Sequence, residues 1–478
     1  MPLQFSASVS APMKPIFSAP TPTGPTPGRT GHALQVSTFL TLLTGLHGSG
    51  WATCIDEVKP EPAAAAASAA VPMAASNPRS QLQSLVQAAL QRSNGIGAAR
   101  LLAEAADQDV NEARASTKPV ASLNASISPE LNTGNTGAPH SSLQARGGVT
   151  VSQTIYDGGR SDRIVDWRRY QAEAARLGTL STQEQITLAT TSMAFERSRF
   201  RMQAVIYGQQ LRKMGCLVES LETIVQADKG RTSEQVQARK QQQQNELQQT
   251  QAQSQARQVE AKLRRIAGDG LPGTEGMGTL LLTVPELPGV LAAAERSADI
   301  SQLDANTRSL REMARVVEAG NKPQLSWSVG GNALVAAAGG TPHTAGVNAG
   351  ITVNIPLLNP SLEYSTQAAR KRADAAALQR AEALEQRRQR IVEVHEQADS
   401  AFDRLRRIGL VLRDSDRLRN FTLQQWQQLG RRSLFDVIGA ETDHYGLRVQ
   451  YVNALHDGQQ MNAMLMSLGQ GLAPWLLN

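Results

Sequence analysis

The chain repeats its own layout after about two hundred residues. Lys118 and Lys322 each open a short alternating segment, and they lie 204 residues apart. The turn glycines Gly230 and Gly430 are separated by 200 residues. Solenoid repeats are far shorter, at about 20–50 residues. The sequence therefore predicts two copies of a domain-sized unit, which we expect at 77–270 and 271–478.

The first 76 residues differ from both copies. Arg29 and His32 precede an apolar segment at about 33–46, and small residues follow it. A basic start, a short apolar stretch and a small-residue end are typical of a secretory signal peptide. We expect 1–76 to be a disordered leader that contains this signal and a flexible linker.

Two cysteines, Cys54 and Cys216, allow at most one disulfide and offer no metal pattern. The residues before Cys54 fit a lipoprotein signal poorly, and the sequence leaves its lipidation open. Cys216 falls in a helical run, where a small packed hydrophobe is the simplest interpretation.

Each copy contains a pair of segments in which apolar and small polar residues alternate, and we expect β-hairpins at 119–155 and 324–355. In the second pair, Trp327 and Val329 alternate with serine and glycine. Segments of about 10 residues with one apolar face are typical of transmembrane barrel strands, although a single strand fits a soluble sandwich edge equally well. Four strands are too few to close a barrel, and open edges are not tolerated in lipid. We therefore expect several copies of the chain to share one barrel.

Helical stretches without an internal proline follow each hairpin. At 1.5 Å per residue, each long stretch would rise about 100 Å, and helices of that length in water favour coiled-coil-like packing. The helices that we expect are a single one at about 78–116, long ones at 161–228 and 362–428, and return helices at 232–267 and 432–468.

Turn residues mark the start of both long helices. Asp157 or Asn359 is expected to cap the helix that follows, while glycine or proline provides the special backbone geometry. The strand–helix junctions are Tyr156, Asp157, Gly158 and Gly159 in the first copy, and Pro356, Asn359 and Pro360 in the second.

Several classes of function are opposed by what the sequence contains. The seven histidines have no ligand spacing, and neither a nucleophile–base pair nor a phosphate loop is present. We therefore expect no enzyme, no cofactor and no metal site. The arginines at 387–390 alternate with other residues at helical spacing, which favours a solvated helix face over a nucleic-acid site. Two functions remain for a chain of this kind: a channel through the outer membrane, or a trimeric coiled-coil adhesin or structural protein of the cell envelope. Hairpins that are internal and duplicated favour the channel.

Three motifs, taken with the duplication, resemble the TolC-like outer-membrane efflux protein family. They are Tyr-Asp-Gly-Gly-Arg at 156–160, Ile-Pro-Leu-Leu-Asn-Pro at 355–360 and Gly-Arg-Arg-Ser-Leu-Phe-Asp-Val at 430–437. The resemblance covers about 78–470. It implies an α+β membrane protein of a Gram-negative bacterium. In such a protein a homotrimer shares a twelve-stranded β-barrel in the outer membrane and continues into the periplasm as a helical barrel.

The same resemblance implies a passive exit duct. Its partners would be a periplasmic adaptor, an inner-membrane ABC or proton-driven transporter, and outer-membrane lipid, with no nucleic acid. The arginine content is high, and the periplasmic end of the channel would carry few acidic residues. Both features lead us to expect type I protein secretion. Multidrug or metal efflux through the same architecture is the alternative.

The resemblance also assigns residues to a channel gate at the second helix turn. Arg432 matches the family's latch arginine, and Asp436 matches its first constriction aspartate. Gln427 occupies the position of the latch tyrosine, and Glu441 lies two residues beyond the position of a second aspartate. A solvated ion pair at a helix start is the alternative for Arg432 and Asp436. Adaptor tips are expected to dock at the turn residues Gly230, Arg231, Gly430, Arg431 and Ser433.

Overall fold

The structure is a computed structural model that describes residues 77–132, 140–337 and 344–477. The expected signal peptide, the linker and Cys54 lie outside these ranges. The first copy forms α1 (Pro78–Arg92), α2 (Asn94–Ala115), β1 (Val120–Asn132), β2 (His140–Tyr156), α3 (Arg160–Ala227), η2 (Lys229–Arg231) and α4 (Thr232–Ala267). The second forms η3 (Met277–Thr279), α5 (Leu287–Ala294), α6 (Ala298–Ala319), β3 (Gln324–Ala337), β4 (Thr344–Asn354), α7 (Pro360–Leu429), α8 (Leu434–Leu468) and α9 (Leu472–Leu477).

The helix expected at about 78–116 is in fact two helices, because Ser93 interrupts it. Ser93 has an extended backbone, with φ −73° and ψ 111°, and its side chain accepts a hydrogen bond from the Ile96 amide. A serine that caps in this way starts a new helix. No proline lies between Arg79 and Ser116, but the Asn94-Gly95 pair that follows Ser93 is a turn signal that our prediction did not use.

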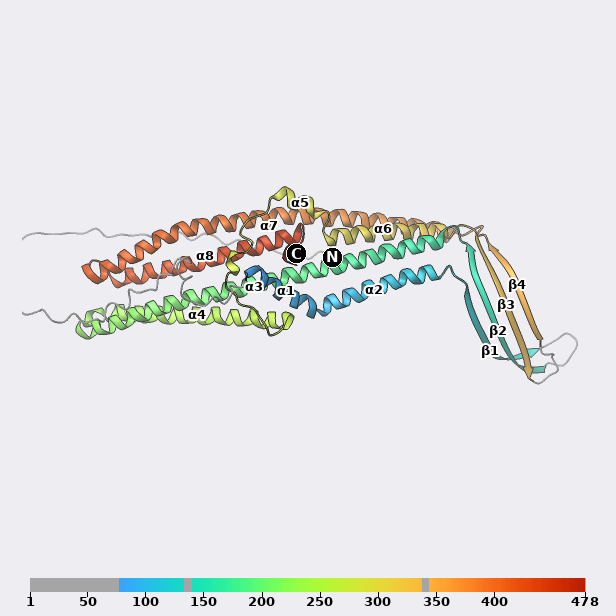
Figure 1. Cartoon of the computed structure of the whole chain (residues 1–478), viewed down its shortest axis with the longest axis horizontal. Helices are drawn as coiled ribbons and strands as arrows, with labels where there is room; N and C mark the ends of the chain where they lie inside the picture. Colours follow the sequence, from blue (N-terminus) through green and yellow to red (C-terminus); the bar gives the residue numbers. More distant parts are fainter. Residues whose placement is uncertain (1–76, 133–139, 338–343, 478) are drawn as a thin grey trace, which may run out of the picture. The chain divides into compact units, whose positions relative to one another are not determined.

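All four strands belong to one antiparallel sheet in the order β1-β2-β3-β4, as Figure 1 shows. The central pair, β2 and β3, joins the two copies, with Val151 opposite Val329. Apolar residues of neighbouring strands share a face, because opposite residues in a sheet point the same way. Leu123 therefore lies beside Val149. This face is open in the single chain, and Leu123 is 76% exposed.

Helix α3 contacts different helices along its length. Near the sheet it packs against α2 and α6, and α6 in turn packs against α7; the exposed Arg176 guanidinium donates to the Asp107 carboxylate on α2 at 2.8 Å. Farther from the sheet α3 packs against α4 and α8, and the Gln203 amide donates to Asn453 on α8 at 2.5 Å. The two copies are therefore joined through α3 as well as through the sheet.

Exposed apolar side chains are found on strands and helices alike. Leu101 and Leu102 on α2 are 65% and 67% exposed, and Leu378 on α7 is 73% exposed. Within the described ranges, no helix combines the length and the apolar character needed to cross a membrane.

Candidate channel mouth and strand–helix junctions

The first strand–helix junction depends on Asp157. One carboxylate oxygen accepts hydrogen bonds from the amides of Gly159 and Arg160, each at 3.0 Å, and the other accepts one from the Ser161 amide at 2.7 Å. Partial burial favours a raised pKa for Asp157, but the bonds from the Ser161 hydroxyl and from these amides outweigh it and lower the pKa. Asp157 thus satisfies the free amides at the start of α3.

Two glycines carry the chain through this junction. Gly158 and Gly159 have φ values of 68° and 81°, which favour glycine. A side chain on Gly158 would also clash with Lys322, since its Cβ would lie 2.4 Å from the Lys322 Cβ. The Lys322 ammonium donates to the Gly158 carbonyl at 2.9 Å. Lys322 marks the second repeat in the sequence, and the structure adds a contact with the first repeat that sequence reasoning missed.

The second junction starts its helix differently. Pro360 is at the first helical position of α7, but the Asn359 side chain makes no capping hydrogen bond, contrary to our expectation. The side-chain amide oxygen of Asn359 instead accepts a hydrogen bond from the Ser361 hydroxyl at 2.7 Å. Proline at the first position lacks an amide and has its φ fixed near the helical value, so it favours the start of α7 by itself. Pro356 precedes this turn in the stretch between β4 and α7.

At the opposite ends of the long helices, the turn between α7 and α8 forms around Ser433. Ser433 and Asp436 make a capping box: the Asp436 amide donates to the Ser433 hydroxyl at 3.3 Å, and the Ser433 amide donates to the Asp436 carboxylate at 3.2 Å. Gly430 has φ 58°, in the left-handed region, and ends α7. The Arg431 amide donates to the Gln425 carbonyl at 3.3 Å.

Two of the predicted gate residues meet in this turn. The Arg432 guanidinium lies 4.0 Å from the Asp436 carboxylate, and the two side chains are 52% and 45% exposed. Arg432 also donates to the Gln425 side chain at 3.2 Å. Gln425 was not predicted; Gln427, which was, is half-buried in the last turn of α7. An exposed ion pair contributes at most about 1 kcal/mol, so within one chain the main contact of Asp436 is the capping box.

Glu441, another of the predicted gate residues, does not lie beside Arg432 and Asp436. Its side chain is 1% exposed and lies between three helices. The Arg419 guanidinium on α7 is 3.3 Å from it, and the Lys213 ammonium on α3 is 4.0 Å away. We call Lys213, Arg419 and Glu441 the buried ion cluster. Neither cation was predicted, although Glu441 comes seven residues after the buried Leu434, a spacing that places it on the inward face of α8.

The first return turn has a different backbone. The Asp228 carboxylate accepts a hydrogen bond from the Gly230 amide at 2.9 Å. Arg231 lies 3.9 Å from Asp228 and 4.0 Å from Glu234. Gly230 falls in the short helix η2, whereas Gly430 is left-handed. The two docking turns predicted by analogy are therefore not structural copies.

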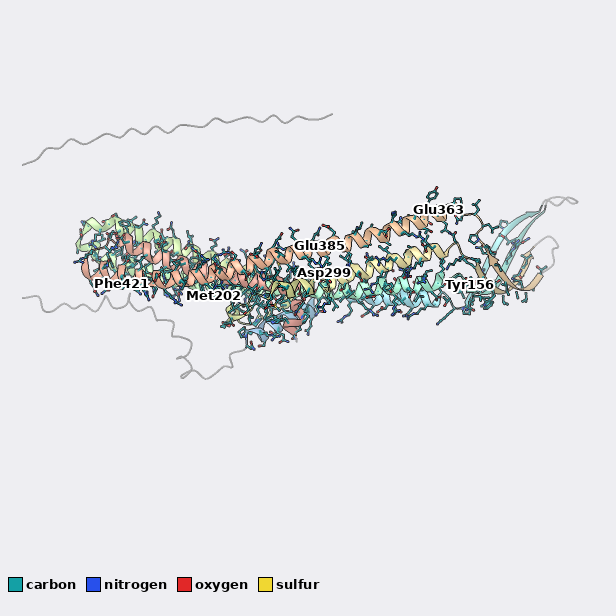
Figure 2. All side chains as sticks on the ribbon, turned by 90° about the horizontal axis from the view of Figure 1, so that it is seen from above. Tyr156, Met202, Asp299, Glu363, Glu385 and Phe421 are labelled. Atoms are coloured by element: carbon teal, nitrogen blue, oxygen red, sulfur yellow. The ribbon has the colours of Figure 1, made fainter. Side chains whose placement is uncertain are left out.

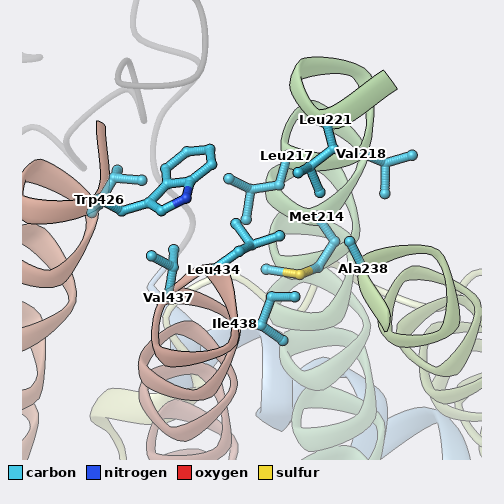
Figure 3. Packing of buried hydrophobic residues seen from close by; sticks show 10 residues of the cluster. Met214, Leu217, Val218, Leu221, Ala238, Trp426, Leu434, Val437 and Ile438 are labelled. Atoms are coloured by element: carbon cyan, nitrogen blue, oxygen red, sulfur yellow. The ribbon is translucent and has the colours of Figure 1, made fainter. Parts of the chain in front are cut away.

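An apolar cluster holds these two turns together within one chain. It joins Leu217 and Leu221 of α3 to Trp426 of α7 and to Leu434 and Ile438 of α8 (Figure 3). Figure 2 shows both regions of interest, with Tyr156 beside the sheet and Phe421 near the far end of α7. The junctions and the turns thus lie at opposite ends of the long helices.

One family model matches part of this arrangement. Residues 85–269 match the profile of the family described as "Outer membrane efflux protein". Over these residues, which lie in the first repeat, the chain is similar to that family. No curated protein matches the chain.

Solved outer-membrane channels share the fold of this chain at low sequence identity. CusC matches with a TM-score of 0.73 at 16% identity, covering 82% of this chain and 92% of that one. VceC from Vibrio cholerae matches at 0.68 and 17%, over 82% and 97%. The open-state MtrE channel of Neisseria gonorrhoeae matches at 0.68 and 15%, over 82% and 89%. The fold is therefore the α+β fold of TolC-like outer-membrane channels, as expected.

The matched family is described as one of outer-membrane efflux proteins, and the solved structures named above are described as outer-membrane or transmembrane proteins. Both findings agree with the outer-membrane location expected from the sequence.

Proposed function

We propose that three copies of this chain close edge to edge into one passive exit duct. The carrying observation is that the sheet has two open edges, β1 and β4. Unpaired backbone groups are very costly in lipid, and a four-stranded sheet is too small to close on itself. Pairing β4 of one copy with β1 of the next removes both edges, and three copies give twelve strands.

The helices support the same closure. Contacts run in the order α2, α3, α6 and α7, so α2 and α7 are the edges of this layer. Each edge carries exposed leucines, Leu101 and Leu102 on α2 and Leu378 on α7. Contacts through α3 and α6 place these leucines at a common level. The Thr179 hydroxyl on α3 donates to the Ala99 carbonyl on α2, and Arg380 on α7 pairs with Asp304 on α6. Gln302 of α6 lies close to Gly178 of α3, so the two pairs are at the same height. Packing α7 of one copy against α2 of the next would bury them.

Native mass spectrometry and planar-bilayer recording of detergent-extracted protein test this proposal. We expect a trimer and a small, stepwise conductance. A stable monomer without conductance, or a protein that needs no detergent, would contradict the duct and favour the structural or adhesin reading.

Within the duct, we propose that the turn between α7 and α8 forms the constriction. Three copies would bring three Asp436 carboxylates and their Arg432 partners to the axis, where negative charge attracts cations. Gln427, in the last turn of α7, would line the channel just before the constriction. Glu441 is buried, which supports a role in holding the helices together behind the constriction.

Asp436→Asn should reduce cation selectivity, with Glu246→Gln on the exposed face of α4 as the charge-matched control. Equal selectivity in both variants would remove Asp436 from the constriction.

We also propose that both turns receive a periplasmic adaptor, which links the duct to an inner-membrane pump. Arg231, Arg431 and Ser433 are exposed or half-exposed there, and Gly230 and Gly430 set the turn backbones. Arg431→Glu should weaken adaptor capture in a pull-down without changing trimer yield. Unchanged capture would place docking elsewhere.

For the cargo, we propose a polypeptide delivered by a type I secretion pump. Arg231, Arg431 and Arg432 are exposed or half-exposed at the turns, and their positive charge supports passage of an acidic polypeptide. Drug or metal efflux is the second candidate, and the efflux description of the family favours it. Deleting the gene and measuring secreted protein beside drug and metal tolerance separates them. Lost tolerance with normal secretion would overturn the polypeptide cargo.

A further inference from the structure

We propose that a cleft among the long and return helices binds a small amphipathic anion, which is a molecule with an apolar body and one carboxylate group. The cleft is lined by α3, α4, α7, α8 and the segment between α4 and α5, and its volume is about 990 Å³. Small-molecule sites have volumes of about 300–1,000 Å³. All of the lining residues belong to one chain and to the described ranges, so the site forms without a second copy.

Apolar side chains supply most of the lining. Met202 and Val205 of α3 are 37% and 59% exposed, and Leu412 of α7 and Val452 of α8 lie on the same surface; Met202 is labelled in Figure 2. The contact that we propose between copies uses leucines of α2 and α7 and does not involve these residues. An apolar ligand body would remove Met202 and Val205 from water, which is favourable in proportion to the area covered.

The segment between α4 and α5 closes one side of the cleft, where Gly276 and Gly278 belong to the lining. The fully buried Gln459 of α8 holds this segment in place. Its side-chain amide donates to the Met277 carbonyl at 2.8 Å and to the Leu280 carbonyl at 2.7 Å. Binding to a site that is already ordered avoids the entropic cost of ordering it. The cleft is therefore ready for a ligand.

Cations outnumber carboxylates around this apolar surface. The Glu260 carboxylate is shared between the Arg197 guanidinium at 3.0 Å and the Arg201 guanidinium at 2.5 Å. These three groups together carry one positive charge. Arg257 of α4 and Arg448 of α8 add two more guanidiniums to the lining.

Arg257 and Arg448 are available to a ligand. Among the described residues no carboxylate pairs with either guanidinium, and Arg448 instead lies over the Tyr445 ring, 5.2 Å from its centroid. The other carboxylate of the lining, Glu275, is exposed on the segment between α4 and α5. The site therefore has four guanidiniums and two carboxylates. Guanidinium groups bind carboxylates through strong, charge-assisted hydrogen bonds, which favours an anionic ligand over a cationic or neutral one.

Photo-crosslinking of the full-length protein in lipid nanodiscs tests the site, with a decanoate that carries a diazirine as the probe. We expect saturable labelling of peptides from 198–206 and 253–260, and unlabelled decanoate should compete with it. Decanol that carries the same diazirine lacks the charge and should label these peptides at least about tenfold more weakly. Labelling that does not saturate, or that is equal for the alcohol, would overturn the proposal. So would labelling that is absent from these peptides because another copy covers them.

Substitutions of the two unpaired arginines test the charge. Arg257→Gln combined with Arg448→Gln should raise the probe concentration needed for half-saturation at least about tenfold. Arg264→Gln, at an exposed position of α4 outside the lining, is the control and should leave this concentration unchanged. Equal values in the double variant and in the control would overturn the proposal.

A second pair of variants tests the apolar surface. Val205→Glu places a carboxylate on this surface and should abolish saturable labelling, whereas Leu247→Glu, at an exposed position of α4 outside the lining, should not. Both positions are exposed, and melting temperatures verify that both variants remain folded. Unchanged labelling in Val205→Glu would overturn the proposal. The cleft lies within one chain, so this proposal and the trimeric duct succeed or fail separately.

Discussion

At the scale of single residues, Glu441 shows how burial changes the role of a charge. Its carboxylate links α8 to Arg419 on α7 and to Lys213 on α3, and its side chain is almost inaccessible to water. Removing one member of a buried ion pair leaves its partners poorly solvated, at a cost of about 3–5 kcal/mol. The buried ion cluster therefore fixes α7 and α8 to α3 within one chain.

We predict that Glu441→Leu lowers the free energy of unfolding by about 3 kcal/mol. Thermal melting of the detergent-extracted protein measures the change. Glu246→Gln, which removes an exposed carboxylate from α4, should shift stability by less than about 0.5 kcal/mol. Equal melting temperatures for both variants would mean that the cluster contributes no stability.

Asp157 gives a prediction with a defined pH dependence. Its hydrogen bonds outweigh partial burial and lower its pKa, so the folded state favours the ionised form. The stabilisation is present above the ordinary aspartate pKa of about 3.9 and is lost as the pH falls through the lower, folded value. Asp157→Ala should cost about 1 kcal/mol at pH 7 and progressively less as the pH falls through the folded value. Amide exchange at the start of α3, followed from pH 7 into the acid range, checks this, and a cost that is independent of pH would refute it.

At the scale of elements, the sequence is informative wherever a repeating pattern sets the structure. Alternation in the segments around Trp327 and the absence of proline from the long helices predicted the hairpins and the long helices, and the resemblance to a known family supplied the fold class. The break at Ser93 was missed because the Asn94-Gly95 pair that follows it, a turn signal, was not considered. Glu441 was placed at the gate because it lies two residues beyond the position of the family's second aspartate, whereas its phase on α8 buries it within one chain. Lys213 and Arg419 were missed because only the tertiary structure brings three helices together.

Two glycines near the second turn provide a matched test of backbone geometry. Gly430 has φ 58°, and a Cβ there would meet nothing within 4 Å, so Gly430→Ala should cost about 1 kcal/mol through strain alone. Gly439 lies inside α8 and is equally open, so Gly439→Ala should stabilise by up to about 1 kcal/mol. Melting temperatures should move in opposite directions. Shifts of the same sign would show that the left-handed turn is not retained.

At the scale of the whole molecule, the open edges of the helical layer provide a test of assembly. We predict that Leu101→Lys combined with Leu102→Lys shifts the extracted protein from trimer to monomer, because it places two charges where apolar contact is proposed. Gln108→Lys, an exposed position of α2, is the control and should leave the trimer intact. Native mass spectrometry gives the populations. An unchanged trimer in the leucine variant would place the interface elsewhere.

The pairing of β2 with β3 has a further consequence for how the protein is made. Val151 and Val329 come from different repeats, with α3 and α4 between them in the sequence. During synthesis and export, the first hairpin emerges long before the strand that covers its inner edge. Contacts so distant in sequence form slowly, and an uncovered strand edge is a site of aggregation in the meantime. The nascent protein should therefore depend on a periplasmic chaperone until the second hairpin arrives.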